Sequence, residues 1–89
     1  MAAEFQLEII TPNGTFYSKK VTSLVAPQMD GYFGVLAFHA PLLARSAGGT
    51  LTVHESGTST KQFRIGPGAV EVLKNRAVIL SKQAATLSP

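Results

Sequence analysis

The chain has 89 residues, of which 45% are hydrophobic and 15% are charged, and eight Lys and Arg against five Asp and Glu give a net charge of +3. This length predicts a single domain, residues 1–89, with one small core. The composition excludes a disordered chain, and no apolar run is long enough to insert into a bilayer. The lack of cysteine excludes disulfides, thiolate nucleophiles and cysteine-bound metals.

The basic residues are scattered along the chain, and only Lys19 and Lys20 are adjacent. A nucleic-acid-binding surface would combine clustered basic residues with aromatic residues placed for stacking. We therefore expect no nucleic-acid partner. Residues 1–5 lack the basic start and the apolar stretch of a signal peptide, so secretion by that route is not expected.

Alternating apolar and polar residues, interrupted by turn residues, predict an all-β chain. A first strand begins at Phe5 and ends at the turn signal of residues 12–14, Pro-Asn-Gly. Residues 15–18 predict a second, short strand, and Lys19-Lys20 begin a connection. Residues 21–26 predict a further strand, closed by Pro27. Both of its faces carry apolar residues, which indicates a strand covered on both sides.

Two hairpins are predicted in the second half of the chain. Matching apolar faces across the first hairpin requires an odd-numbered loop, which residues 57–59 provide. The predicted pairs are Val53 with Phe63, Leu51 with Ile65, and Glu55 with Lys61.

The second hairpin has a two-residue turn at Lys74-Asn75, since asparagine tolerates positive φ. Its predicted pairs are Val72 with Ala77 and Val70 with Ile79. Residues 83–89 predict an edge strand or a frayed end. In total we expect about ten short strands in two sheets, forming a small β-sandwich or flattened barrel.

No constellation of catalytic or ligand-binding residues is evident. His39 and His54 lie in different segments, and five carboxylates are spread over five segments. The Gly-Pro-Gly of residues 66–68 lacks the lysine and the following helix of a phosphate-binding loop. We therefore expect no catalytic residue, no metal and no cofactor, and we favour a structural or contact role for His39 over a catalytic one.

The most distinctive stretch is residues 30–43, where Tyr32, Phe33 and Phe38 stand among glycines and a proline. Phe33 is expected in the core, whereas Tyr32 and Phe38 lie near turn positions. A small β domain rarely exposes aromatic side chains there unless they contact a partner. Two hypotheses follow: a protein-binding surface, or a small-ligand or carbohydrate-binding module that uses Tyr32 and Phe38 as a platform.

Three segments carry a resemblance to a known family: residues 7–12 (Leu-Glu-Ile-Ile-Thr-Pro), residues 30–43, and residues 63–72 with Gly68 and Glu71. From Phe5 to about Ser81 the chain resembles the N-terminal β-sandwich domain of the epsilon subunit of F-type ATP synthases. The resemblance implies a non-catalytic subunit in the rotor's central stalk. Such a subunit joins the gamma subunit to the ring of c subunits in a proton- or sodium-translocating enzyme. It is connected to the alpha and beta catalytic subunits only indirectly.

The resemblance also implies two contact surfaces and a location. The loop that touches the c ring is matched by Met29, Asp30, Gly31 and Tyr32. The side that faces gamma is matched by Thr11, His39, Ala40, Pro41, Leu42 and Leu43. Such a subunit is peripheral on the cytoplasmic face of a bacterial plasma membrane, or on the stromal side of a thylakoid in a plastid.

The chain departs from the family pattern in three respects. Relatives often carry an acidic or polar residue at the position of Tyr32, and a proline with a small or polar residue in place of Ala37-Phe38. The C-terminal helical hairpin of the family is missing from these 89 residues. That hairpin inhibits ATP hydrolysis in many relatives and holds a nucleotide in some, so we expect neither activity from this polypeptide.

Overall fold

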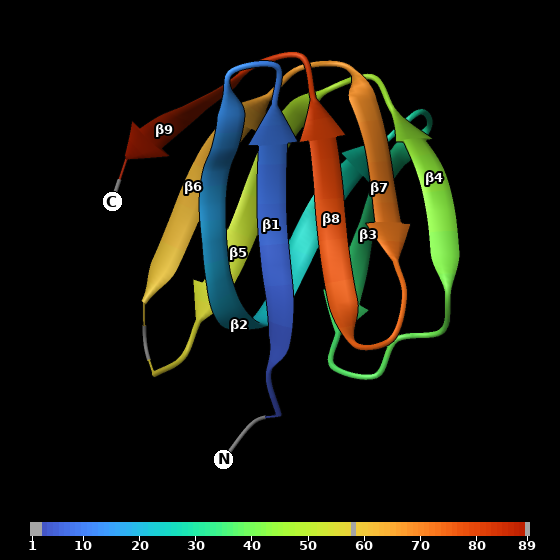
Figure 1. Ribbon diagram of the computed structural model, residues 1–89, viewed down its shortest axis with the longest axis vertical. Helices are drawn as coiled ribbons and strands as arrows, with labels where there is room; N and C mark the ends of the chain where they lie inside the picture. Colours follow the sequence, from blue (N-terminus) through green and yellow to red (C-terminus); the bar gives the residue numbers. More distant parts are fainter. Residues whose placement is uncertain (1–2, 58, 89) are drawn as a thin grey trace.

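The structure is a computed structural model that describes residues 3–57 and 59–88, so Thr58 of the predicted hairpin loop lies outside the described residues. The described residues form strands and no helix (Figure 1). The strands are β1 (Phe5–Thr11), β2 (Gly14–Gln28), β3 (Gly31–Leu36), β4 (Leu42–Ser46), β5 (Gly49–Glu55), β6 (Thr60–Ile65), β7 (Gly68–Val72), β8 (Arg76–Ser81) and β9 (Ala84–Ser88). The all-β prediction is confirmed, with nine described strands where about ten were expected.

The strands form one hydrogen-bonded sheet in the order β4-β7-β8-β1-β2-β5-β6-β9, and β3 pairs with β2. The first part of β2 pairs with β1 and its second part with β3 and β5. Because β2 bends between the two, the sheet folds back on itself as two layers, with β1, β7 and β8 in front of β3 and β5 (Figure 1). The two predicted sheets are therefore two parts of one continuous sheet.

The predicted connection at Lys19-Lys20 is wrong, because β2 runs without interruption for 15 residues. Lys19 pairs with Leu7 and Lys20 with Gln6 inside the β1–β2 ladder. Register shifts between Ile9 and Ile10, and on β2 between residues 21 and 23, let the strand bend without ending.

The predicted end of this strand at Pro27 and the covering of both its faces also need correction. Pro27 is buried within β2, opposite Tyr32. Val25 is 40% exposed while Leu24 and Ala26 are buried. The face opposite the core is therefore open at Val25 but covered at Pro27.

The core lies between the two layers and draws on seven of the strands. Alternation along β1 buries Phe5, Leu7 and Ile9, as the sequence predicts. The remaining buried apolar residues are Val21, Leu24, Ala26, Val35, Leu51, Val53, Phe63, Ile65, Val70, Val72, Ala77 and Ile79. Phe33, predicted in the core, is half-buried and packs against this cluster.

The β7–β8 hairpin has the predicted register, with Val72 opposite Ala77 and Val70 opposite Ile79. Lys74 and Asn75 have φ of +52° and +58°, as a primed two-residue turn requires. The amide of Leu73 donates to the Arg76 carbonyl at 2.9 Å, and the Arg76 amide returns a bond at 3.1 Å. At the end of the chain, β9 is the edge strand that was one of the two expectations for residues 83–89.

The predicted register of the β5–β6 hairpin is wrong by two residues. Leu51, and not Val53, lies opposite Phe63, while Val53 lies opposite Lys61. The Glu55 amide donates to the Ser59 carbonyl at 2.9 Å, which places the loop one residue earlier than predicted. A shift of two residues leaves every side chain on its predicted face, so the alternation pattern could not reveal it.

Candidate functional site

The turn between β2 and β3 forms an exposed tip at one end of the sandwich. Gln28 pairs with Gly31, which leaves Met29 and Asp30 as the two turn residues. Gly31 has φ of +142°, in the region that favours glycine. Met29 is 55% and Tyr32 58% exposed, so all four residues predicted to contact the c ring lie together at this tip.

The side chain of Tyr32 lies over the start of β5. A Cβ atom added to Gly49 would come within 3.1 Å of the Tyr32 hydroxyl and 3.4 Å of the Pro27 Cβ. Gly49 also has φ of +143°, which side chains rarely allow. A glycine at this position therefore leaves room for the Tyr32 side chain and supports its orientation at the tip.

Two open grooves run beside the tip. The larger, of about 590 Å³, is lined by Met29, Arg45, Ser46, Ala47, Pro67, Gly68 and Lys82. Its neighbour, of about 330 Å³, is lined by Ile10, Thr11, Pro12, Pro67, Gly68, Leu80, Ser81 and Lys82. The two grooves share Pro67, Gly68 and Lys82, so Thr11 lies at the same end of the sandwich as the tip.

The segment from His39 to Leu43 leads into the edge strand β4 at the opposite end. His39 is half-buried, and its Nδ1 lies 2.7 Å from the Ala40 carbonyl oxygen. Ala40 and Pro41 are exposed, Leu42 is half-buried against the core, and Leu43 is 75% exposed. Leu42 pairs with Val72, so this segment stands beside the β7–β8 turn.

The residues predicted to face gamma are thus not gathered at one point. Ladder pairs connect Ser46 to Gly68 and Gly68 to Ser81, at the end where Thr11 stands. His39 precedes the opposite end of β4, so the length of this strand separates it from the end where Thr11 lies. Thr11 therefore lies at the same end of the sandwich as the tip, and His39 lies near the opposite end.

The sheet surface between these two ends was not singled out from the sequence. Side chains on the solvent side of β4, β7, β8 and β1 form a mixed surface that we term the outer face. Leu43, Glu71, Val78 and Glu8 form one row of paired residues across it, and Arg45, Ala69, Leu80 and Ile10 form the next. The apolar outward positions of β1 and β8 are the sequence signal that could have revealed it.

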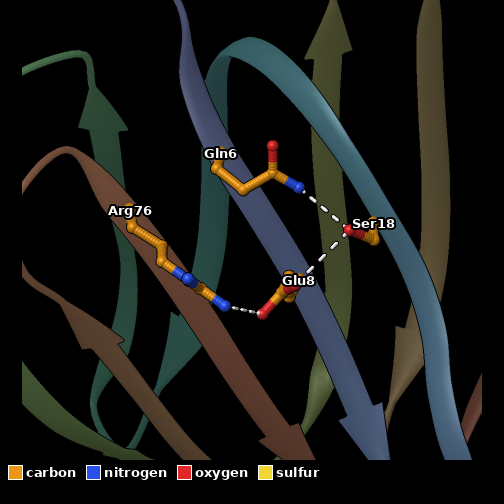
Figure 2. Close-up of polar contacts among 4 residues, drawn as sticks. All are labelled: Gln6, Glu8, Ser18 and Arg76. Atoms are coloured by element: carbon orange, nitrogen blue, oxygen red, sulfur yellow. Dashed lines mark hydrogen bonds and ion pairs between the residues drawn. The ribbon is translucent and has the colours of Figure 1, made fainter.

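A polar network lies at the β1 border of the outer face and extends onto β2 (Figure 2). Arg76 on β8 pairs with the Glu8 carboxylate on β1. Ser18 on β2 donates to Glu8 at 3.5 Å and accepts a bond from the Gln6 side-chain amide at 2.9 Å. The outer face also exposes leucines, with Leu43 at 75%, Leu80 at 51% and Leu73 at 46%. This combination of fixed charges and exposed apolar side chains is typical of a protein-contact surface.

The remaining candidate groups for chemistry are engaged in local contacts. The Tyr17 hydroxyl donates to Glu55 at 2.5 Å, and Lys19 lies 3.9 Å from the same carboxylate. Burial, together with the bond and charge of Glu55, raises the pKa of Tyr17 well above its ordinary value of 10.0. His54 is exposed, and its Nδ1 lies 3.1 Å from the Thr60 hydroxyl.

Within residues 3–57 and 59–88, no group of three or more His, Cys, Asp or Glu side chains is placed to hold a metal ion. Across the same described part of the chain, no helix has the length and hydropathy needed to span a membrane.

Comparison with known proteins identifies the family. The sequence model described as ATP synthase, Delta/Epsilon chain, beta-sandwich domain matches residues 4–86. The chain belongs to this family. The resemblance predicted from residues 7–12, 30–43 and 63–72 is therefore confirmed.

Curated members of the ATP synthase delta/epsilon family align along most of the chain. It is 41% identical over 78 residues to the ATP synthase epsilon chain of Chlorobium limicola, covering 88% of this chain and 89% of that one. It is 39% identical over 79 residues to the epsilon chain of Chlorobaculum tepidum, covering 90% of the latter. The epsilon chain of Paramagnetospirillum magneticum is 32% identical over 84 residues, but only 63% of that protein is covered. The epsilon chains similar to this one therefore differ in length.

Solved structures share the fold. A chain in the mitochondrial ATP synthase of Euglena gracilis superposes with a TM-score of 0.88 at 23% identity, covering 97% of this chain and 55% of that one. A chain in the central stalk and c-ring structure of Tetrahymena thermophila ATP synthase superposes with a TM-score of 0.77 at 14% identity, covering 94% and 67%. The two-layer β-sandwich is thus the fold of these proteins as well.

Proposed function

We propose that this chain is a central-stalk subunit of an F-type ATP synthase, which links the gamma subunit to the ring of c subunits and has no catalytic residue of its own. The observation that carries the proposal is the 41% identity to an ATP synthase epsilon chain over nearly the whole of both proteins. The subunit is peripheral on the cytoplasmic face of the plasma membrane in a bacterium, and it reaches the alpha and beta catalytic subunits only through gamma.

The tip of Met29, Asp30, Gly31 and Tyr32 contacts the c ring in this proposal. Its support is geometric: the tip projects from a two-residue turn, its Met and Tyr side chains are more than half exposed, and Gly49 leaves room for Tyr32. Contact residues on loops of a rigid sandwich keep their relative positions when force passes through them. A tip of this kind suits a subunit that must rotate together with the c ring.

The gamma subunit, in turn, lies along the outer face. This arrangement explains how Thr11 and the segment His39–Leu43, at different ends of the sandwich, both contact one partner. Thr11 follows Ile10 on the border of the outer face, and Leu43 belongs to the same surface. The leucines of the outer face supply apolar area, and the Glu8–Arg76 ion pair supplies orientation.

The carbohydrate-binding alternative finds little support in the geometry. Tyr32 stands at the start of β3, and Phe38 follows its end. Four strand steps from Tyr32 to Leu36 span roughly 13 Å, so the two rings do not form one platform for a sugar. A binding site for a small ligand would need convergent groups that these two aromatic residues do not supply.

The test is a pull-down with the tagged chain from membranes of the source cell that are solubilised in mild detergent. The recovered partners are identified by mass spectrometry. Recovery of gamma with c and the catalytic subunits supports the proposal. Recovery of none of these by a folded chain contradicts it. In parallel, the isolated chain should neither hydrolyse ATP nor bind it tightly, and turnover abolished by His39→Ala would restore the enzyme hypothesis.

A further inference from the structure

Phe38 combines two properties that rarely occur together. Its φ is +63°, the left-handed region in which a bulky side chain is an outlier. The His39 amide donates to the Leu36 carbonyl at 3.2 Å, so Phe38 is the third residue of a tight turn, where a positive φ favours glycine. Its side chain is nevertheless 76% exposed, so burial does little to offset the strain.

The backbone of Phe38 is held in place by Asn75. The Phe38 amide donates to the Asn75 Oδ1 at 2.7 Å, and the Asn75 side-chain amide donates to the Glu4 carbonyl at 3.0 Å. The Gln6 amide also donates to the Asn75 carbonyl at 3.3 Å. One asparagine therefore joins the start of β1, the β3–β4 loop and the β7–β8 turn. The aromatic residue is presented from a fixed point, which lowers the entropic cost of binding.

Two exposed leucines belong to the segments that carry and hold Phe38. Leu36, two residues earlier, is 66% exposed, and Leu73, beside the turn that holds Asn75, is 46% exposed. Phe38 is also joined directly to His39, the first residue of the segment that faces gamma in the proposed function. A fixed aromatic residue with apolar neighbours matches a partner that offers an apolar pocket rather than a charged surface.

We infer that Phe38 anchors the contact with the gamma subunit, by inserting its ring into an apolar pocket of gamma. The inference rests on the proposed function, in which gamma covers the outer face and the adjoining segment. It assigns to Phe38 a binding role that accounts for its strained and exposed state. Residues kept in strained conformations by their surroundings concentrate at functional sites.

The test compares four variants of the full chain, Phe38→Gly, Phe38→Ala, Phe38→Tyr and Val25→Thr. Binding is measured to the alpha-beta-gamma assembly of the same source prepared without this chain, and thermal unfolding is measured in parallel. Val25 is the matched control, because it is 40% exposed on the other layer, on a face open to solvent. Self-association is followed by light scattering.

Phe38→Gly and Phe38→Ala should each weaken binding roughly 30-fold or more, as truncation of an aromatic anchor does. Phe38→Tyr and Val25→Thr should bind within a few-fold of the unmodified chain. The midpoint of thermal unfolding should stay constant or rise by a few degrees in Phe38→Gly, since glycine relieves the strain.

Two outcomes would overturn the inference: unchanged binding of Phe38→Gly to the assembly, whether or not its self-association changes, or a clear fall in its unfolding midpoint. In each of these cases the unmodified chain still binds the assembly, so the proposed function stands. Failure of the unmodified chain to bind would instead contradict the proposed function, and with it the inference.

Discussion

Ser81 carries its hydroxyl into the interior at the point where the β6–β7 corner meets the β8–β9 corner. It is only 5% exposed. Its Oγ accepts a hydrogen bond from the Gly66 amide at 2.8 Å and donates one to the Gln83 carbonyl at 2.5 Å. A single polar side chain thus satisfies backbone groups of two connections that the sheet ladders leave unpaired. Sequence patterning shows Ser81 only as a polar residue at the end of a strand.

Replacing this serine should therefore destabilise the fold. Ser81→Ala removes the hydrogen bonds of the hydroxyl to the Gly66 amide and the Gln83 carbonyl, although the Gly66 amide keeps its own bond to the Gln83 carbonyl at 3.1 Å. At about 0.5–1.5 kcal/mol for each bond of the hydroxyl, we expect a loss of about 1–3 kcal/mol in the free energy of unfolding, measured by urea titration. Ser18→Ala removes an exposed hydroxyl and should change that free energy by less than about 0.5 kcal/mol. Equal effects of the two substitutions would contradict the role given to Ser81.

The Tyr17–Glu55 contact predicts a pH dependence at the alkaline end. Tyr17 keeps its proton in the folded chain above its ordinary pKa of 10.0, whereas the unfolded chain releases it near that value. Above about pH 10 the unfolded state then binds fewer protons than the folded state, so the free energy of unfolding falls as pH rises. Below pH 10 this contribution is fully present.

The measurement is urea unfolding of the unmodified chain and of Tyr17→Phe between pH 8 and about pH 11. The difference between them isolates Tyr17, because every other titratable group is common to both chains. The unmodified chain should lose stability more steeply than Tyr17→Phe above about pH 10. Parallel curves would show that Tyr17 ionises alike in both states.

At the scale of the strands, local turn chemistry decided which sequence predictions succeeded. Lys74-Asn75 is a two-residue turn, so its position alone sets the register of β7 against β8. The β5–β6 loop has no such constraint, and alternation could not distinguish pairings that differ by two residues. In β2, the lysine pair suggested a connection, yet Lys19 and Lys20 lie inside the β1–β2 ladder. Both side chains are exposed although adjacent strand residues point to opposite faces.

Asn75 stabilises the fold through the hydrogen bonds of its side chain as well as through its positive φ. Asn75→Gly retains the left-handed turn but removes the bonds to the Phe38 amide and the Glu4 carbonyl. At about 0.5–1.5 kcal/mol for each hydrogen bond, the expected loss is about 1–3 kcal/mol in the free energy of unfolding.

Asn75→Ala removes the same bonds and also forces alanine to adopt φ of +58°, so it should be less stable than Asn75→Gly by about another 1 kcal/mol. Denaturant unfolding of both variants checks the order. If Asn75→Gly is as stable as the unmodified chain, the side-chain bonds contribute nothing and the turn conformation alone matters.

For the whole molecule, the sequence predicted which loops are exposed but not how they are arranged. Tyr32 and Phe38 are exposed, as their places near turns indicated. Thr11 lies at the same end of the sandwich as the tip, while His39 lies at the other end. This arrangement depends on the long strand β2 and the parallel pairing of β1 with β8, which link distant segments. The outer face is a product of the same topology, since its rows combine residues up to about 70 positions apart.

Separate contact surfaces should act independently in the proposed stalk subunit. Tyr32→Asp places a charge at the tip and should reduce recovery of c subunits by the tagged chain, with gamma retained. Leu43→Asp places a charge on the outer face and should reduce recovery of gamma. Both side chains are more than half exposed, so the unfolding free energy should change by less than about 0.5 kcal/mol in either variant.

Binding of purified c ring and of the alpha-beta-gamma assembly, measured separately, gives the decisive comparison. Sites that share no partner and lie more than about 7–10 Å apart have additive effects. The double variant Tyr32→Asp with Leu43→Asp should therefore show each loss at the size seen in the single variants. If Tyr32→Asp weakens gamma binding as strongly as c-ring binding while the fold is intact, the tip and the outer face form one surface, and the division of contacts between them is wrong.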